Sequence, residues 1–351
     1  MSALRAACLP PPAKAASESE HVALLVAARA CLLAKGVSLW QLSGLASRLG
    51  SAAAIIEGDY QPETPWEVKA DAAIREAAPE LARWRAELGR SLDQWQRSGL
   101  RLTTVLDEDY PLNLRYVYDR PPFLFYRGEL RDDDGYALAV VGTRRPSDAG
   151  RRRATRLARL LCERGVTVLS GLATGIDAAA HQATLDHDGR TIAILGHGLS
   201  RPLYPKENRV LGEQIAERGA LVSMFFPDTP PSRATFPLRN TVTSGMGQGT
   251  IVVEAGATSG SRLQARLATE HGKHAFLLAS LVSSHEWARQ FATRDGVLVV
   301  NEVDDVLARL TSSKHLASGL GETDGRASSQ PPVYLDSRAD RAHRHGQQRL
   351  L

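Results

Sequence analysis

A strand, turn and helix pattern that occurs twice in succession between residues 137 and 181 constrains this 351-residue chain most. The apolar run Ala137–Val141 is typical of a buried strand, and the turn Gly142-Thr143-Arg144 follows it. After a helix, a second short strand over 166–169 leads into Ser170-Gly-Leu-Ala-Thr-Gly-Ile-Asp177, which opens another helix. Such a repeat predicts parallel strands whose carboxyl ends face helix N-termini, where small residues and the positive helix end favour a bound anion.

The same alternation continues to residue 310. Short apolar runs predict further strands near 191–195, 220–222, 250–253, 275–278 and 297–300, with helical patterns between them. The segment 227–237 contains four prolines and predicts an irregular loop that includes Phe236 and Pro237. We therefore expect an α/β protein with an extended Rossmann-like, mostly parallel sheet over residues 100–310.

The first third of the chain is helical in pattern. Glycines at 36 and 58 separate short helical segments, which predicts a small helical domain over 20–65, of SAM or helix-hairpin-helix type. Such a module could hold a nucleic-acid backbone or serve only in packing or dimerisation, and the sequence leaves both open. Residues 66–99 predict connecting helices. Residues 1–19 and 311–351 lack periodicity, so we expect disordered tails and no C-terminal winged helix.

Composition excludes few functions. A net charge of +4 and a pI of about 9.0 permit a polyanionic partner. The three cysteines have no metal-ligand spacing, and no apolar stretch would span a bilayer, so a cytoplasmic protein without a metal or a membrane partner is expected. Neither G-x-G-x-x-G nor a P-loop is present, which argues against a dinucleotide or ATP cofactor, and we expect no cofactor.

Arginines and one phenylalanine surround the predicted turns. Arg144 lies within the first turn, and Arg233 and Arg239 flank Phe236. Arginine can grip a phosphate with two hydrogen bonds, and a phenylalanine ring can stack on a base. A solvated charged face is the alternative. We expect Arg144 and Arg239 to face solvent from opposite sides of one crevice.

Asp177 and His181 are separated by one helical turn. Together with Glu254 they could supply acid and base groups for a hydrolase. The alternative is structural, with Asp177 capping the helix and His181 packing or pairing with it. We favour the structural role, and we expect a binding protein and not an enzyme.

Five motifs in sequence order resemble one known family. They are Val140-Val-Gly-Thr-Arg144, Ser170–His181, Tyr204-Pro-Lys-Glu-Asn208, Phe236-Pro-Leu-Arg-Asn240, and Val252-Val-Glu-Ala255 with Ser259-Gly-Ser261. Together they are similar to the DNA-processing protein A (DprA, or Smf) family over about residues 100–310. This chain has Thr143 where the family usually has Ser, and Ala279-Ser280 where it usually has Pro-Gly.

The resemblance implies a cytoplasmic protein that binds single-stranded DNA, forms homodimers and assists loading of RecA recombinase during natural transformation. The DNA or phosphate contacts that it implies are Gly142, Thr143, Arg144, Ser170, Gly171, Arg233, Phe236, Arg239 and Asn240. The second hypothesis is a nucleotide-binding or nucleotide-cleaving protein of phosphoribohydrolase type. Gly245-Met-Gly-Gln-Gly-Thr250 followed by Glu254 only partly matches the turn of that class.

Overall fold

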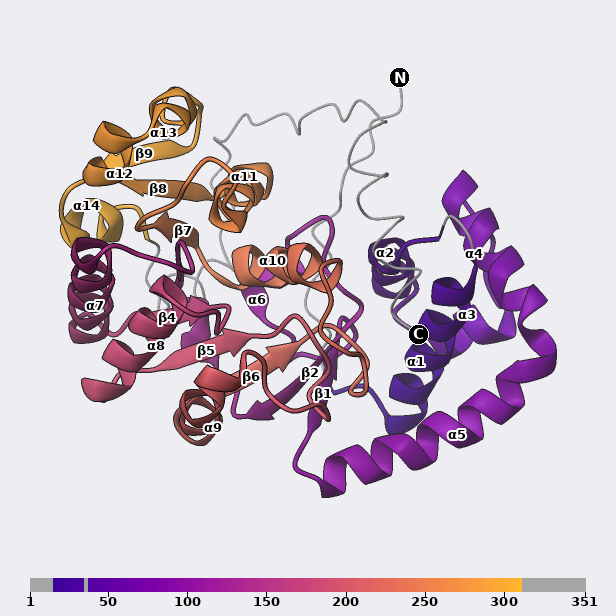
Figure 1. Cartoon of the computed structure of the whole chain (residues 1–351). Helices are drawn as coiled ribbons and strands as arrows, with labels where there is room; N and C mark the ends of the chain where they lie inside the picture. Colours follow the sequence, from indigo (N-terminus) through magenta and orange to yellow (C-terminus); the bar gives the residue numbers. More distant parts are fainter. Residues whose placement is uncertain (1–14, 35–36, 311–351) are drawn as a thin grey trace.

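A nine-stranded sheet forms the centre of the molecule in the computed structural model, which describes residues 15–34 and 37–310 (Figure 1). The strand order is β1-β2-β6-β5-β4-β3-β7-β8-β9. The bounds are β1 Arg101–Thr104, β2 Phe123–Gly128, β3 Ala137–Val141, β4 Thr167–Ser170, β5 Thr191–Ile194, β6 Ala220–Ser223, β7 Gly249–Val252, β8 His274–Leu278 and β9 Val297–Val300. All pairs from β6 to β9 along this order are parallel, whereas β2 pairs antiparallel with β1 and β6. The predicted fold class is confirmed.

Helices cover both faces of this sheet, and side chains that alternate along β3 show why. Leu138 and Val140 pack in the core under α7 and α8, whereas Ala137 and Ala139 belong to the core on the other side. Figure 1 accordingly shows α10 and α11 above the sheet and α8 and α9 below it. The helices along this part of the chain are α6 Leu112–Arg115, α7 Asp148–Glu163, α8 Ile176–Asp186, α9 Arg209–Arg218, α10 Thr235–Met246, α11 Gly260–Glu270, α12 Ala279–Ser284, α13 Glu286–Phe291 and α14 Val303–Leu307.

Two segments of the sheet domain differ from the prediction. Phe236 and Pro237 lie in the first turn of α10 and not in a loop, because a proline at the start of a helix loses no intrahelical hydrogen bond. Residues 279–284, for which no helix was expected, form the short helix α12. Of the expected tails, only residues 15–19 belong to the described part of the chain, and Glu18 and Ser19 already form the start of a helix there. The region where a winged helix was not expected lies outside the described residues.

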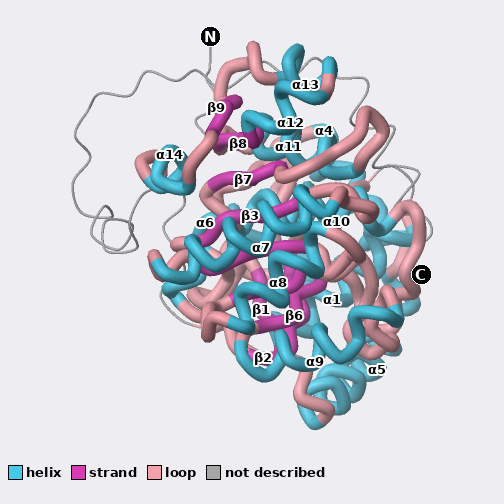
Figure 2. Tube along the Cα trace, turned by 60° about the vertical axis from the view of Figure 1, so that its left-hand side comes forward, coloured by secondary structure: helices cyan, strands magenta, loops and turns pink. Residues whose placement is uncertain are grey.

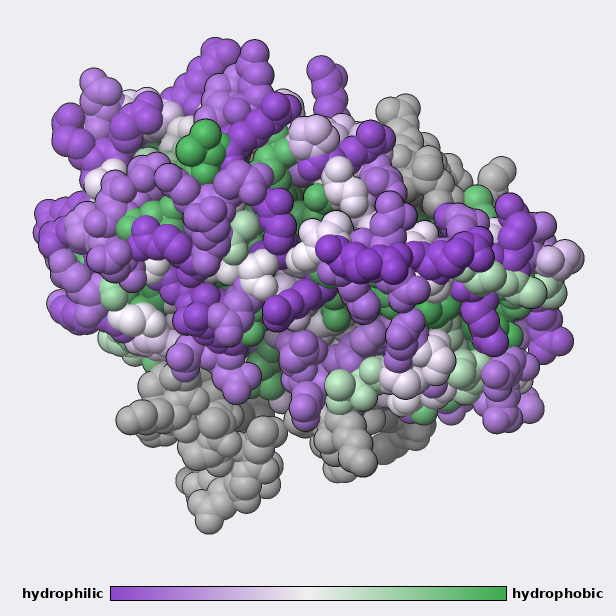
Figure 3. Space-filling view, turned by 90° about the horizontal axis from the view of Figure 1, so that it is seen from below, coloured by the Kyte–Doolittle hydropathy of each residue, from purple (hydrophilic) through white to green (hydrophobic). Residues whose placement is uncertain are grey.

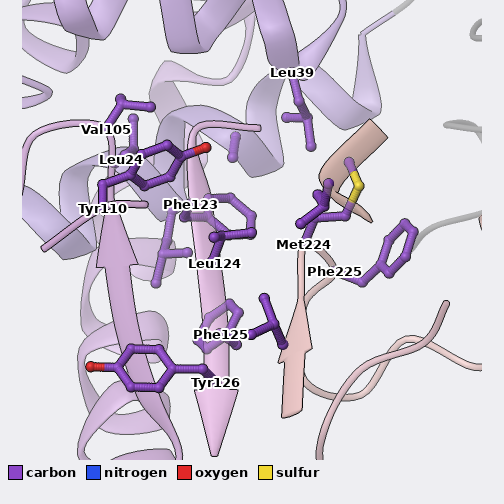
Figure 4. Packing of buried hydrophobic residues seen from close by; sticks show 14 of the residues in the cluster. Leu24, Leu39, Val105, Tyr110, Phe123, Leu124, Phe125, Tyr126, Met224 and Phe225 are labelled. Atoms are coloured by element: carbon purple, nitrogen blue, oxygen red, sulfur yellow. The ribbon is translucent and has the colours of Figure 1, made fainter. Parts of the chain in front are cut away.

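In the described residues before the sheet the helices are α1 Glu18–Leu33, α2 Leu39–Leu49, α3 Ala53–Glu57, α4 Pro65–Glu76 and α5 Ala78–Arg97. They pack beside the β1–β2 end of the sheet (Figure 1), and Figure 2 shows α1 and α5 at that end from another side. Leu24 of α1 and Leu39 of α2 lie in one apolar cluster with Phe123 of β2 and Phe225 after β6 (Figure 4). The helical part and the sheet therefore share a hydrophobic core.

The surface is mostly polar where it can be seen from below. Hydrophilic residues dominate that face, and apolar residues appear there in small separate areas (Figure 3). Among the described helices, none combines the length and the apolar character that crossing a membrane requires.

Candidate nucleic-acid interface

A crevice of about 480 Å³ lies at the carboxyl ends of the central strands. Its walls come from four segments that are distant in sequence. They are the turn after β3 at 142–145, the turn after β4 at 171–173, the first half of α10 at 236–243, and the segment 256–264 that leads into α11. Open parallel α/β sheets bind ligands at this edge. A crevice forms there at the point where the strand order reverses, because the loops after the two neighbouring strands run to opposite faces of the sheet.

Arg144 and Phe236 stack on each other in the wall of this crevice. The Arg144 side chain is exposed, and its guanidinium carbon lies 5.6 Å from the centre of the half-buried Phe236 ring. Tyr204, which is 46% exposed, has its ring centre 5.9 Å from that of Phe236. Only Phe236 was expected to stack on a base, and Tyr204 was missed, although the motif Tyr204–Asn208 signalled it. A cation and two adjacent rings suit a phosphate with a neighbouring unpaired base.

Arg239 lies at the floor of the crevice and is only 7% exposed, so the expectation that it faces solvent is wrong. Its guanidinium donates a hydrogen bond to the Ile194 carbonyl, while its Nε has no partner among the described residues. Burial lowers the pKa of Arg239 and raises the pKa of the Asp177 carboxyl, and the two opposite charges partly offset both effects. The floor thus holds a buried cation with an unused donor.

Glycine at position 171 is required by this arrangement. A methyl group added there would overlap the Arg239 guanidinium. The Gly171 N–H donates to the Asp177 carboxylate at 3.1 Å, and the Thr143 N–H donates to the Glu254 carbonyl at 2.7 Å. Both amides are therefore engaged within the protein. Two of the backbone donors expected from the turns are not free for an anion.

The segment before α11 contributes polar groups that were not among the predicted contacts. Ser259 caps α11, and its hydroxyl accepts from the Ser261 N–H. Both residues and Gly260 line the crevice, as Arg144 does. The N-terminus of a helix of 11 residues adds positive potential there. The motif Ser259-Gly-Ser261 was the available sequence signal.

Glu254 has a structural position. Its carboxylate accepts from the Ser147 N–H at 2.9 Å and from the Ser147 hydroxyl at 2.6 Å. Ser147 in turn caps α7 by accepting from the Gly150 N–H. Glu254 therefore fixes the start of α7 beside the crevice, and it does not line the crevice.

His181 is fully buried and does not pair with Asp177. The Thr191 hydroxyl donates to the Val168 carbonyl, so its oxygen accepts from His181 Nδ1 at 2.7 Å. Burial lowers the pKa of His181 to about 3, which keeps the imidazole neutral. Asp177 lines the crevice whereas His181 does not, so the two form no acid and base couple there.

Some of the remaining predicted contacts line the crevice and others do not. Gly142, Thr143 and Asn240 line the crevice together with the residues above. Ser170 is buried and donates its hydroxyl to the Val140 carbonyl, and the exposed Arg233 lies outside the crevice. Within the described residues, no group of three His, Cys, Asp or Glu side chains is placed to hold a metal ion.

Comparison with protein-family models supports the sequence resemblance. The model of DNA recombination-mediator protein A matches residues 101–311, which is more than half of the chain. The chain belongs to this family. The expected family is confirmed, and its matched region contains every wall of the crevice.

Curated relatives and solved structures agree with this assignment. Protein Smf of Escherichia coli (strain K12) is 35% identical over 264 residues, which are 75% of this chain and 70% of that protein. DNA processing protein DprA of Bacillus subtilis (strain 168) is 31% identical over 66% of this chain and 78% of its own length. The structure of DNA processing protein A from Streptococcus pneumoniae superposes with a TM-score of 0.67 at 27% identity, over 85% of this chain and 99% of that one. A structure described as showing a single-stranded DNA binding mode, that of DNA processing protein A from Helicobacter pylori, is similar in fold (TM-score 0.53, 24% identity) over 63% of this chain and 96% of that one.

Proposed function

We propose that this protein binds single-stranded DNA in the crevice, with little sequence preference, as part of DNA processing and recombination. The observation that carries the proposal is Arg144 held over the Phe236 ring at the rim of a crevice whose floor holds Arg239. A cation beside aromatic rings can bind a phosphate while the rings stack on bases, without reading base edges. Bases in a duplex have their faces covered by their neighbours, so the rings favour an unpaired strand.

Family membership supports a wider role. Members are described as DNA recombination mediators and DNA processing proteins. We infer that the protein protects incoming single-stranded DNA, assists RecA loading during natural transformation and acts as a homodimer in the cytoplasm. These finer statements rest on the resemblance.

The alternative, cleavage of a nucleotide, has less support. It needs an acid and a base that reach the ligand. His181 is buried and donates to Thr191, the Glu254 carboxylate binds Ser147, and Asp177 accepts from the Gly171 N–H. Release of a free nucleobase from a nucleoside monophosphate would nevertheless establish that activity.

Replacement of Arg144 tests the proposal. Arg144→Ala should weaken binding of an oligothymidine strand and lower the slope of log affinity against log salt by about 0.7 for each phosphate that the variant no longer binds. Stability should change by about 0.5 kcal/mol or less, because this side chain is exposed. Fluorescence anisotropy over a salt series measures both the affinity and the slope.

The matched control is Arg85→Ala, which removes one exposed arginine from α5. It should leave the salt slope unchanged. If Arg144→Ala and Arg85→Ala gave the same salt slope, the DNA would bind outside the crevice. Tighter binding of a duplex than of a single strand of the same length would also contradict the proposal.

A further inference from the structure

Three consecutive arginines on α7 lie near the crevice but do not line it. Arg151, Arg152 and Arg153 are exposed in the first two turns of this helix. The helix starts directly after the turn that carries Arg144 and Arg145, and the bond network of Glu254 and Ser147 fixes its first turn beside that turn. The three side chains therefore extend the basic rim of the crevice.

These arginines lack the partners that exposed helical arginines usually have. Among the described residues, none of the three forms an ion pair, whereas Arg156 and Arg159 on the same helix pair with Glu302 and Glu163. Four residues after Arg152 comes Arg156, a like charge that destabilises a helix. Cations in a first turn also oppose the positive end of the helix dipole. Asp148 in the first turn offsets part of this cost, but among the described residues it forms no ion pair with any of the three arginines.

The arrangement of the three side chains fits a strand that crosses the helix. Successive helical residues point about 100° apart, so the arginines fan across α7. Arg151 lines a hollow of about 510 Å³ shared with α8 and α9, and Arg153 lines one of about 230 Å³ shared with α14. Arg152 lies between them in sequence. The acidic residues Asp186 and Glu207 border the first hollow, and Glu302, already paired with Arg156, borders the second.

We propose that Arg151, Arg152 and Arg153 form a second phosphate-binding surface, so that one DNA strand occupies the crevice and continues across α7. A polyanion is the occupant because it offsets both the unpaired charges and their conflict with the helix dipole. The inference rests on the proposed function and adds a longer binding footprint to it.

Oligothymidines of two lengths test the inference, one of about 6 nucleotides that can fill only the crevice and one of about 20. The triple variant Arg151→Ala, Arg152→Ala, Arg153→Ala should bind the long strand several-fold more weakly, with a salt slope lower by up to about 2. It should bind the short strand as the unaltered protein does. The control triple variant Arg85→Ala, Arg90→Ala, Arg97→Ala removes the same charge from α5, on the opposite side of the molecule (Figure 1), and should change neither affinity.

The outcomes separate the two proposals. Equal loss on both lengths, or equal loss in the control triple variant, would overturn the second surface, because the arginines would then act on the crevice itself or through net charge alone. An unchanged long-strand affinity would overturn it too. If Arg144→Ala leaves both lengths unaffected, the proposed crevice site fails independently.

Discussion

At the scale of single residues, burial decides the chemistry of His181. The imidazole Nδ1 carries the proton that it donates to Thr191, and Nε2 is buried with no partner among the described residues. Burial disfavours a second proton on this ring, and the nearby Arg239 cation disfavours it further, which together outweigh the favourable effect of the Ser170 backbone on the pKa. The unfolded chain, in contrast, takes up this proton near the ordinary pKa of 6.5.

This difference predicts a dependence of stability on pH. Between pH 6.5 and about 3 the unfolded state binds one more proton at His181 than the folded state, so stability is full above 6.5 and falls as the pH is lowered through this window. His181→Asn keeps a donor for Thr191 and cannot take up the proton. Its free energy of unfolding in urea should therefore fall less between pH 6.5 and 4 than that of the unaltered protein. Parallel curves for the two proteins would contradict this account.

At the scale of elements, α10 connects the crevice to the interior. Its first half carries Phe236, Arg239 and Asn240, and its end is held by the half-buried Lys273. The Lys273 amino group lies within 3.4 Å of four carbonyl oxygens, three from the end of α10 or the turn after it and one from Asn113. The last carbonyls of a helix need such donors because the helix itself supplies none.

Lys273→Met should therefore destabilise the protein by about 2 to 4 kcal/mol, because several buried carbonyls lose their donor. Binding of single-stranded DNA should weaken as well, since α10 positions the residues at the crevice. Urea unfolding and anisotropy measure the two effects. Lys69→Met, which removes an exposed lysine from α4, should change neither. A stability loss as small as that of the control would contradict the anchoring role.

The elements themselves could largely be predicted from sequence. Buried parallel strands are short apolar runs ended by glycine, so β3 was predicted to the residue and β4 within one. The start of α10 could not be read, because prolines before and within its first turn look like a loop. The burial of Arg239 depends on Ile194 and Asp177, which are distant in sequence, and no local pattern contains that information. The motif Ser259-Gly-Ser261 did signal the segment that leads into α11, but only the fold shows that these residues line the crevice.

At the scale of the whole molecule, Asp107 joins the N-terminal helices to the sheet. This residue follows β1 in sequence. Its carboxylate accepts hydrogen bonds from the Thr104 N–H at 2.8 Å, from the Ala16 N–H at 2.6 Å and from His21 Nε2 at 2.8 Å. Beside it, the Trp95 ring of α5 packs edge-on against Phe125 of β2, with ring centres 5.2 Å apart. A shared core and a buried polar junction couple the two parts energetically.

This coupling predicts that the helical part and the sheet unfold together. In hydrogen exchange at increasing denaturant, peptides from α1 and from β3 should become exposed with the same midpoint, because α1 loses its apolar partners when β2 unfolds. Asp107→Ala leaves the N–H groups of Ala16 and Thr104 without their acceptor, which should reduce the free energy of unfolding by about 1 to 3 kcal/mol. The midpoints of α1 and β3 should therefore fall by the same amount. Asp93→Ala removes an exposed carboxylate from α5 and should leave both unchanged. If Asp107→Ala lowered the midpoint of α1 alone, the helices would be an independent unit, and their packing against β2 would contribute little to the stability of the sheet that forms the crevice.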